Sequence, residues 1–346
     1  MFNKIFINKK NLLHNLHYVE KFIKDKKICV MVKANAYGHG MKEIALCLKD
    51  ENVSFGVSNE NEAFELRNYT DKEIIVFGAV EDYEKIAQMN IEFAVFSFQQ
   101  VKKLCKLSKF ENLSFKIHLC INTGMNRYGI KTHSELLKII KILNKYGKQL
   151  KGLYTHFSSL TTDKEYTQKQ KDKFCSFCSL LPSNWNTITH VGGGKAVFND
   201  IEAQMFRSGI EIYGYGDENL LPVMAIESQI VDVVKVFKGE HVGYLCSFTA
   251  DKDMIVGAIP LGYGDGLPRK LSNKLVVSNY KNNRIKNVGN ICMDCFMVDI
   301  SNLKTKVGDK ILIMDNASNF TEALGTTEYE VLTNFTKFRG ERIIID

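Results

Sequence analysis

The residues best suited to chemistry are a lysine that follows an apolar run and two glycine-containing segments far from it in the chain. Lys33 comes directly after the apolar run 28–32 and is followed by small residues, which leave room for a ligand beside its amine. Residues 192–194 are consecutive glycines, and Gly209 lies in a second segment. Glycine amides can approach an anion because no Cβ stands in the way. The pattern predicts an amine able to form an imine with a carbonyl compound, close to a site for an anionic group.

Other polar residues flank apolar runs in the same way. Arg127 ends the segment 122–127, His156 follows the apolar run 152–155, and Arg207 precedes Gly209. Taken singly, each candidate has a simpler explanation, such as a surface lysine, a tight turn, a buried structural histidine or an arginine in a salt bridge. Compatible chemistry at several separate strand ends is much rarer by chance, so their combination favours one active site.

The framework expected around these residues is a parallel barrel. From residue 27 to residue 216, short apolar runs alternate with amphipathic helical patterns, which is typical of βα units. The number of runs favours a (β/α)8 TIM-type barrel over a doubly wound sheet, and a barrel places functional residues at the C-terminal ends of its strands. The expected strands are 28–33, 54–58, 74–79, 93–96, 115–121, 152–157, 187–191 and 208–213, and the expected helices include 41–48, 59–66, 81–89, 134–146 and 167–181.

A second domain is expected after the barrel. Beyond Gly216 the apolar runs are separated by short turns with hardly any helical pattern, which predicts a mostly antiparallel β domain. We expect a barrel over residues 1–222 and a β domain over 223–346. A lysine imine beside a phosphate site at a barrel mouth is what pyridoxal 5'-phosphate requires, since its aldehyde is anchored covalently and its phosphate is held without a bond.

Composition argues against several other classes of protein. The net charge of +7 comes from lysines spread along helical segments with no recognition motif, so no nucleic-acid partner is expected. No apolar run is long enough to span a membrane and no signal segment precedes the barrel, so we expect a cytoplasmic protein without a membrane partner. The pairs Cys175/Cys178 and Cys292/Cys295 could form a zinc site, but no companion histidine or turn glycine supports the first pair. No metal is expected.

Five segments of the chain resemble those of the alanine racemases, which are fold-type III pyridoxal-phosphate enzymes. Residues 32–40 (Val-Lys-Ala-Asn-Ala-Tyr-Gly-His-Gly) resemble the cofactor-lysine motif of that family. Residues 122–129 resemble its Thr-Gly-Met-x-Arg-x-Gly segment, 207–214 its Arg-x-Gly-Ile segment, and 262–266 its catalytic tyrosine turn; the segment 291–294 completes the set. The resemblance covers nearly the whole chain and agrees with a barrel followed by a β domain.

The resemblance also implies roles for single residues. Lys33 would hold the cofactor as an imine and act as the base on one face of the substrate, and Tyr263 of a partner subunit would act on the opposite face. His156 would link Tyr263 to Arg207, whose high pKa would keep the cofactor ring nitrogen unprotonated and so limit side reactions. Tyr37, Gly194, Gly209 and Ile210 would cradle the phosphate, and Arg127 with the Met293 amide would bind the substrate carboxylate. The resemblance therefore implies a homodimer with shared sites.

Some positions depart from the family pattern. Cys120 replaces a lysine that is often carbamylated to orient the arginine at position 127, and Asn290 replaces an arginine near the entrance. Gly193-Gly194 replaces Asn-Ser, and Phe338 falls near the usual place of a phosphate-binding tyrosine. Losing two hydroxyl contacts would cost phosphate binding about 1 to 3 kcal/mol. Weak retention of the cofactor is therefore expected.

The expected function is interconversion of L- and D-alanine, which supplies D-alanine for bacterial peptidoglycan. The same residues also suit a serine, lysine or broad-specificity racemase, because the pocket alone sets the choice of amino acid. A non-catalytic carrier of pyridoxal phosphate and an aldolase-type barrel are further alternatives. Neither a carrier nor an aldolase would need Tyr263.

Overall fold

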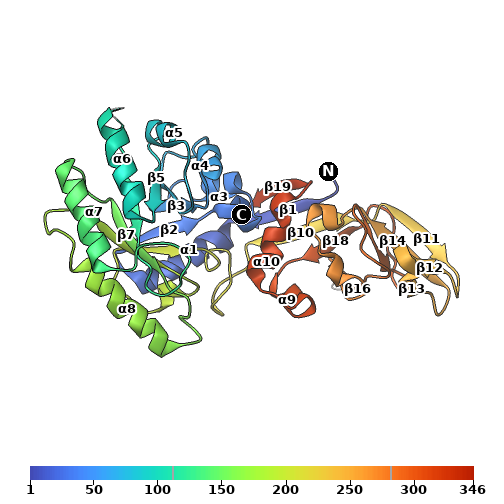
Figure 1. Cartoon of the computed structure of the whole chain (residues 1–346). Coiled ribbons are helices and arrows are strands. Elements are labelled where there is room, and N and C mark those ends of the chain that lie inside the picture. Colours follow the sequence, from blue (N-terminus) through green and yellow to red (C-terminus); the bar gives the residue numbers. More distant parts are fainter. Residues whose placement is uncertain (111–112, 281–282) are drawn as a thin grey trace.

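The structure, a computed structural model, describes residues 1–110, 113–280 and 283–346 and has a barrel beside a second, β-rich domain (Figure 1). The expected (β/α)8 barrel is confirmed, because eight parallel strands close in sequence order. Their bounds are β2 (Lys27–Met31), β3 (Val53–Val57), β4 (Ile74–Val76), β5 (Glu92–Val95), β6 (Ile117–Cys120), β7 (Gly152–His156), β8 (Ile188–Gly192) and β9 (Met205–Ser208).

The barrel helices cover the outside of these strands, and four of them begin at a polar side-chain cap. They are α3 (Met41–Cys47), α4 (Glu60–Leu66), α5 (Tyr83–Gln88), α6 (Phe98–Phe110), α7 (His133–Lys145) and α8 (Lys164–Cys178). Side chains of Asn59, Asp82, Thr132 and Asp163 each accept from a backbone amide in the first turn of the next helix. This bond satisfies one of the unpaired amides at a helix N-terminus. Helix α8 begins and ends three residues before the range expected from the sequence.

The last barrel strand differs from the expectation of residues 208–213. Strand β9 ends at Ser208, and the following residues form turns with bonds from the Ile212 amide to the Gly209 carbonyl and from the Tyr213 amide to the Ile210 carbonyl. Ile210, Ile212 and Tyr213 are buried, which explains why this turn has the apolar pattern of a strand. Gly209 therefore lies just past the C-terminal end of a strand, at the barrel mouth.

The second domain contains the antiparallel strands expected after residue 216. One sheet has the order β16-β15-β18-β10-β1-β19, and a smaller one has the order β11-β14-β17. The bounds are β1 (Lys4–Asn8), β10 (Met224–Gln229), β11 (Asp232–Val236), β12 (His241–Val242), β13 (Phe248–Thr249), β14 (Met254–Ile259), β15 (Val276–Asn279), β16 (Arg284–Lys286), β17 (Phe296–Asp299), β18 (Lys310–Met314) and β19 (Glu341–Ile345). By strand pairing β1 belongs to the larger sheet, although its residues were expected with the barrel.

Helices at both ends of the chain connect the two domains. Helix α1 (Lys9–Ile23) follows β1 back to the barrel, while α9 (Ser318–Leu324) and α10 (Glu328–Thr333) precede β19. The sequence patterns did not indicate α1, α9 or α10. Arg342 of β19 donates to the Gly38 carbonyl at 3.1 Å and to the Phe335 carbonyl at 2.8 Å. The C-terminal segment therefore holds the loop that follows Lys33. Within the described ranges, the structure has no helix long and apolar enough to span a membrane.

Candidate active site

A cavity of about 280 Å³ opens at the C-terminal ends of the barrel strands. The residues that line it come from six of the eight strands or the loops that follow them, and from α10. Of the predicted site residues, it brings together Lys33, Tyr37, Arg127, His156, Gly194, Arg207 and Gly209. Ile210 is buried and does not line the cavity. Tyr263 and Met293 lie in the second domain and do not line the cavity either.

The lysine segment adopts an uncommon backbone conformation. Short helix α2 (Lys33–Tyr37) contains successive left-handed residues, with φ between 50° and 53° from Ala34 to Tyr37. Left-handed conformations cost non-glycine residues about 1 kcal/mol or more each, so the surrounding structure must impose them. The Glu62 carboxylate accepts from the Ala34 amide at 2.8 Å, and the Asn35 side chain accepts from the Met41 amide at 2.7 Å. The turn places Lys33 and Tyr37 on the same cavity.

Burial and charge make Lys33 more often a free amine at neutral pH than an ordinary lysine is. Burial lowers its pKa, and the positive charge of Arg127 lowers the pKa further. A lysine with a lowered pKa is more often the free amine at neutral pH, which is the form that attacks a carbonyl group or accepts a proton. Burial also lowers the pKa of His156 to about 3, with the charges of Arg207 and Arg127 acting in the same direction. This histidine is therefore neutral.

Glycines and tyrosine hydroxyls form part of the cavity wall. A Cβ on Gly209 would lie 2.5 Å from the Tyr37 hydroxyl, and one on Gly192 would lie 2.7 Å from the Arg207 guanidinium. Tyr329 of α10 also lines the cavity, with its ring centroid 5.9 Å from that of Tyr37. Burial raises the pKa of both tyrosines, so their hydroxyls keep their protons and can donate to an anion.

Tyr329 corrects one expectation about the phosphate site. Phe338 was expected to remove a tyrosine hydroxyl from this site, but Phe338 is buried outside the cavity lining and Tyr329 provides a hydroxyl there. Sequence reasoning missed Tyr329 because it comes from a short helix in a region that was expected to be β structure. The signal that could have found it is the Tyr-Glu-Val-Leu pattern at 329–332.

Glu211 is a second residue that sequence reasoning missed. Glu211 is 2% exposed, and its carboxylate accepts from the Lys195 amide at 2.7 Å and from the Gly209 amide at 3.0 Å. The Ser208 hydroxyl also donates to it, at 3.0 Å. The Glu211 carboxylate therefore already accepts hydrogen bonds from backbone amides in the glycine segments that were expected to bind phosphate. The signal was visible as an acid two positions after Gly209.

Arg207 lies at the base of the cavity between two aromatic rings. Its guanidinium carbon is 4.8 Å from the ring centroid of Tyr154 and 5.0 Å from that of Phe77. Its Nη2 donates to the Thr155 carbonyl at 2.7 Å and lies 3.5 Å from His156 Nδ1. Burial lowers the pKa of Arg207, but a guanidinium remains charged at neutral pH. It is a fixed cation that does not give up its proton.

The surroundings of Arg127 match the departure seen at Cys120. Burial raises the pKa of Cys120, and its Sγ donates weakly to the Tyr128 carbonyl at 3.6 Å. Arg127 is exposed, with its guanidinium 5.9 Å from the Tyr128 ring centroid. In the part of the chain that the structure describes, no carboxylate forms an ion pair with Arg127. Its cation is therefore available to an acidic ligand.

Tyr263 and Met293 are held next to each other on the surface of the second domain. The Tyr263 amide donates to the Cys292 carbonyl at 3.0 Å, and the Gly264 amide donates to the Met293 carbonyl at 2.9 Å. Arg339 joins the two segments through Asp265 and Asp294, each at 2.8 Å. The side chains of Tyr263 and Met293 remain 43% and 52% exposed. They are fixed in position but do not reach the cavity of their own chain.

The two cysteine pairs do not form a common site. Cys175 is exposed on α8, and the 292/295 pair lies beside the Tyr263 turn. Among the residues with described positions, no group of three or more histidines, cysteines or acids lies together as metal ligands.

The barrel mouth combines a lysine amine, a buried guanidinium and the glycines at 192–194 and 209, which together are called the glycine cradle. This combination defines a class, the barrel enzymes that bind a ligand through a lysine. The sequence profile described as "Alanine racemase, N-terminal domain" matches residues 7–217, and "Alanine racemase, C-terminal domain" matches residues 223–344. The chain belongs to the alanine racemase family.

Individual relatives cover nearly all of the chain. The alanine racemase of Clostridium tetani is 32% identical, covering 98% of this chain and 94% of the relative, and that of Borreliella burgdorferi is 32% identical with 98% and 96% covered. Among solved structures, alanine racemase of Clostridium difficile has a TM-score of 0.93 at 29% identity, covering 100% of this chain and 96% of the other. That of Bartonella henselae, described with covalently bound pyridoxal phosphate, has a TM-score of 0.87 at 25% identity, with 100% of both chains covered.

Proposed function

We propose that this protein interconverts L- and D-alanine with pyridoxal 5'-phosphate as cofactor. The single observation that carries the proposal is the cavity that joins Lys33 to the glycine cradle and to Arg207 at the barrel mouth. The residues fit the cofactor, since a Cβ at Gly209 would fill the cradle and two protonated tyrosine hydroxyls face it. A racemase for several amino acids remains the second candidate, because the part of Arg127 in binding a carboxylate does not depend on the side chain of the substrate.

The residues around the cavity divide the work between holding and proton transfer. Bound pyridoxal phosphate supplies an electron-withdrawing ring that acidifies the substrate Cα–H bond. Lys33 holds the cofactor and its Nζ moves a proton on one face of Cα. Arg127 and the Met293 amide of a second copy of the chain would hold the substrate carboxylate. Tyr37, Gly194, Gly209 and Tyr329 would surround the phosphate, with Ile210 buried behind them. Arg207 keeps its own proton, and it would face the ring nitrogen of the bound cofactor, where it would limit protonation and so limit side reactions.

Tyr263 completes the site from a second copy of the chain. Inversion needs a proton donor on the face of Cα opposite Lys33. Tyr263 is exposed and does not line the cavity of its own chain, so it cannot serve there from the same chain. Tyr244 and Leu245 are also exposed in the same domain, at 69% and 83%, and the Tyr244 carbonyl accepts from Asn290 beside the 291–294 segment. Exposed apolar side chains around a rigid tyrosine turn are what a subunit interface requires. The protein therefore acts as a homodimer with two shared sites.

We also propose that this enzyme acts in the cytoplasm and supplies D-alanine for peptidoglycan. Support comes from the full-length similarity to bacterial alanine racemases, and from the small amino-acid substrate, which needs no contact with a membrane.

A chiral assay tests the activity directly. Purified protein with added pyridoxal phosphate should convert L-alanine to a mixture of both enantiomers, whereas Lys33→Ala should form no D-alanine because the amine is missing. Lys195→Ala is the matched control, since Lys195 lies beside the glycine cradle but does not line the cavity. Racemisation by Lys33→Ala, or none by the unaltered protein across a panel of L-amino acids, would contradict the proposal.

A further inference from the structure

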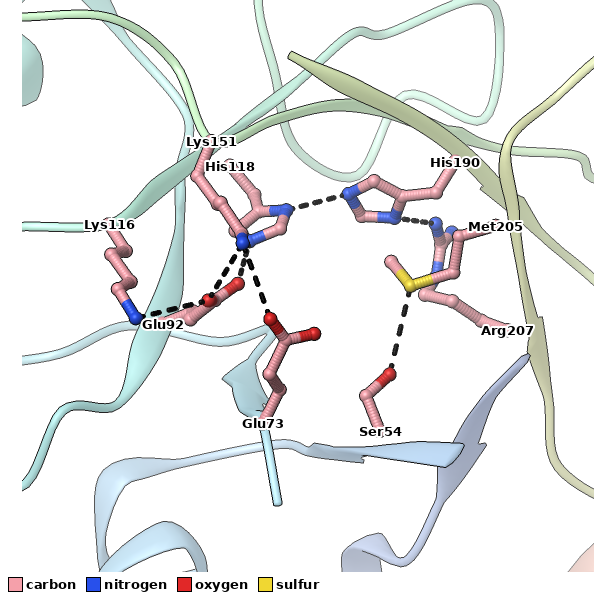
Figure 2. A network of polar contacts seen from close by, with 9 residues as sticks. All are labelled: Ser54, Glu73, Glu92, Lys116, His118, Lys151, His190, Met205 and Arg207. Carbon is pink, nitrogen blue, oxygen red and sulfur yellow. Dashed lines mark hydrogen bonds and ion pairs between the residues drawn. The ribbon is translucent and has the colours of Figure 1, made fainter. Parts of the chain in front are cut away.

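A line of four buried side chains runs from Arg207 into the interior of the barrel (Figure 2). Arg207 Nη1 lies 2.8 Å from His190 Nδ1, His190 Nε2 lies 2.8 Å from His118 Nδ1, and His118 Nε2 lies 2.8 Å from the Glu92 carboxylate. These residues come from β9, β8, β6 and β5. The two histidines and Glu92 are at most 1% exposed. These three side chains are therefore shielded from bulk water.

The direction of every hydrogen bond in the line follows from its two ends. A guanidinium can only donate, so His190 accepts at Nδ1. Burial lowers the pKa of His190, and the charge of Arg207 lowers it further, so its ring is neutral and carries its proton on Nε2. That proton is donated to His118 Nδ1, which leaves His118 Nε2 to donate to Glu92. Each histidine is thereby restricted to one tautomer.

The charges at the two ends are complementary. In the described part of the chain, Arg207 has no carboxylate in an ion pair with it, although buried charges are normally paired. Burial raises the pKa of Glu92, but the hydrogen bond from His118 and the charges of Lys151 and Lys116 outweigh burial, so the pKa is lowered and the carboxylate is charged. Lys151 and Lys116 lie 3.6 and 3.8 Å from its second oxygen. Glu92 is the anion to which Arg207 is connected.

A glycine gives the two imidazole rings the space to meet. A Cβ on Gly152, in the strand between them, would lie 2.1 Å from His118 Nδ1 and 2.9 Å from His190 Nε2. The backbone of Gly152 does not have a positive φ, so conformation alone does not require glycine here. The space is needed for the histidine pair.

We propose that Glu92 is a positioning residue for Arg207, acting through His118 and His190, an inference that rests on the proposed function. The Glu92 carboxylate holds His118 in the Nε2–H tautomer, which keeps His190 Nδ1 an acceptor for the guanidinium. Without it, both rings can reverse, and His190 then presents an N–H to Arg207. Two donors facing each other push the guanidinium away from the place where it faces the cofactor ring.

The first test needs no cofactor. In protein labelled with ¹⁵N-histidine and prepared without cofactor, both rings should show an unprotonated Nδ1 and a protonated Nε2, with assignments from His118→Asn and His190→Asn. Glu92→Leu should give mixed or reversed tautomers. Glu73→Gln is the matched control, because Glu73 pairs with Lys151 at 3.3 Å but does not contact His118. A reversed or doubly protonated histidine in the unaltered protein, or unchanged tautomers in Glu92→Leu, would overturn the proposal.

The second test measures racemisation. We expect Glu92→Leu and Gly152→Ala to lower kcat about tenfold, the effect of losing a hydrogen bond to a charged group, with KM for alanine unchanged because Arg127 is outside the line. If these variants do not fold, Glu92→Gln is decisive, since it keeps an acceptor for His118 but loses the charge. It should retain the tautomers and lower kcat by less than Glu92→Leu, about threefold.

The outcomes separate this inference from the proposed function. Wild-type kcat in Glu92→Gln, or an equal loss in Glu73→Gln, contradicts the role of Glu92. Correct tautomers in a protein that does not racemise any amino acid contradict the proposed function and leave the histidine line in place.

Discussion

At the scale of single residues, the cavity combines groups whose ionisation is set by their surroundings. Lys33 has a lowered pKa because of burial and Arg127, while the two tyrosines that face the cradle have raised pKa values. A free amine and protonated hydroxyls can therefore coexist at neutral pH. This is the combination needed to hold an aldehyde and a phosphate in one cavity.

The pH dependence of cofactor capture should reveal the lowered pKa of Lys33. The reactive form is the free amine, so capture by the cofactor-free protein should rise with pH around a midpoint below that of an ordinary lysine. Arg127→Gln removes a positive charge that lowers this pKa, so the midpoint should move to higher pH. Lys131→Gln, an exposed cation on the same loop, should leave it unchanged. The measurement is the rate at which the absorbance of the imine develops; a midpoint that Arg127→Gln does not move would contradict the assignment.

Glu211 should weaken cofactor binding in the native protein. Its carboxylate accepts from two backbone amides of the cradle, and a bound phosphate would be a second anion beside it. Glu211→Gln removes the charge, so the Kd for pyridoxal phosphate should fall about tenfold, as for removing one charged contact. Equilibrium dialysis measures this, with the exposed Asp200→Asn as control. Weaker binding in Glu211→Gln would mean that the carboxylate helps to build the cradle.

Much of the site was predictable because it depends on local motifs at strand ends. Lys33 and His156 could be found from an apolar run followed by a polar residue, and Arg207 from its place just before Gly209. Glu92, His118 and His190 could not, since they lie inside strands and meet only because neighbouring strands carry them to one point. Tyr329 was missed for a similar reason, because only tertiary contacts bring α10 to the cavity.

At the scale of elements, the central feature is the close contact between the lysine segment and the C-terminal helices. Gly38 ends α2 in the left-handed region with φ 82°, and a Cβ there would lie 2.3 Å from the Leu332 carbonyl. Arg342 donates to the Gly38 carbonyl from the other side. The position of Lys33 therefore depends on a residue that lies 304 positions after Gly38 in the sequence.

Gly38→Ala should destabilise the protein by more than the cost of placing an alanine at a positive φ. An alanine at positive φ costs about 1 kcal/mol, and the clash with backbone adds more, so we expect a loss above about 2 kcal/mol in the free energy of unfolding. Gly239→Ala is matched, since Gly239 has φ 90° but a Cβ added there would meet no atom within 4 Å. Urea unfolding provides the comparison. Equal losses in both variants would show that the contact with Leu332 does not matter.

Element prediction succeeded where periodicity and tertiary structure agree. The barrel strands and helices alternate clearly, so all eight repeats were expected. The last strand was misplaced because buried turn residues such as Ile212 have the composition of a strand. Strand β1 pairs with β10 and β19, and no local pattern indicates partners so distant in the chain.

At the scale of the whole molecule, the two proposed catalytic residues lie apart within one chain. Lys33 lies at the barrel mouth, while Tyr263 is on an exposed turn of the elongated second domain (Figure 1). The turn is rigid, because Arg339 binds Asp265 and Asp294 and backbone bonds join it to the Met293 segment. A rigid exposed tyrosine suits a site completed by a second copy of the chain.

Complementation between two inactive variants tests this account most directly. Lys33→Ala and Tyr263→Phe chains, unfolded and refolded together, should form heterodimers with one site that has both residues and one that has neither. Random pairing makes about half of the dimers mixed, and each should have about half the activity of the native dimer, so racemisation of alanine should return to about one quarter of the native rate. If both residues acted within one chain, every site would carry a lesion, and the refolded mixture would be as inactive as each variant alone.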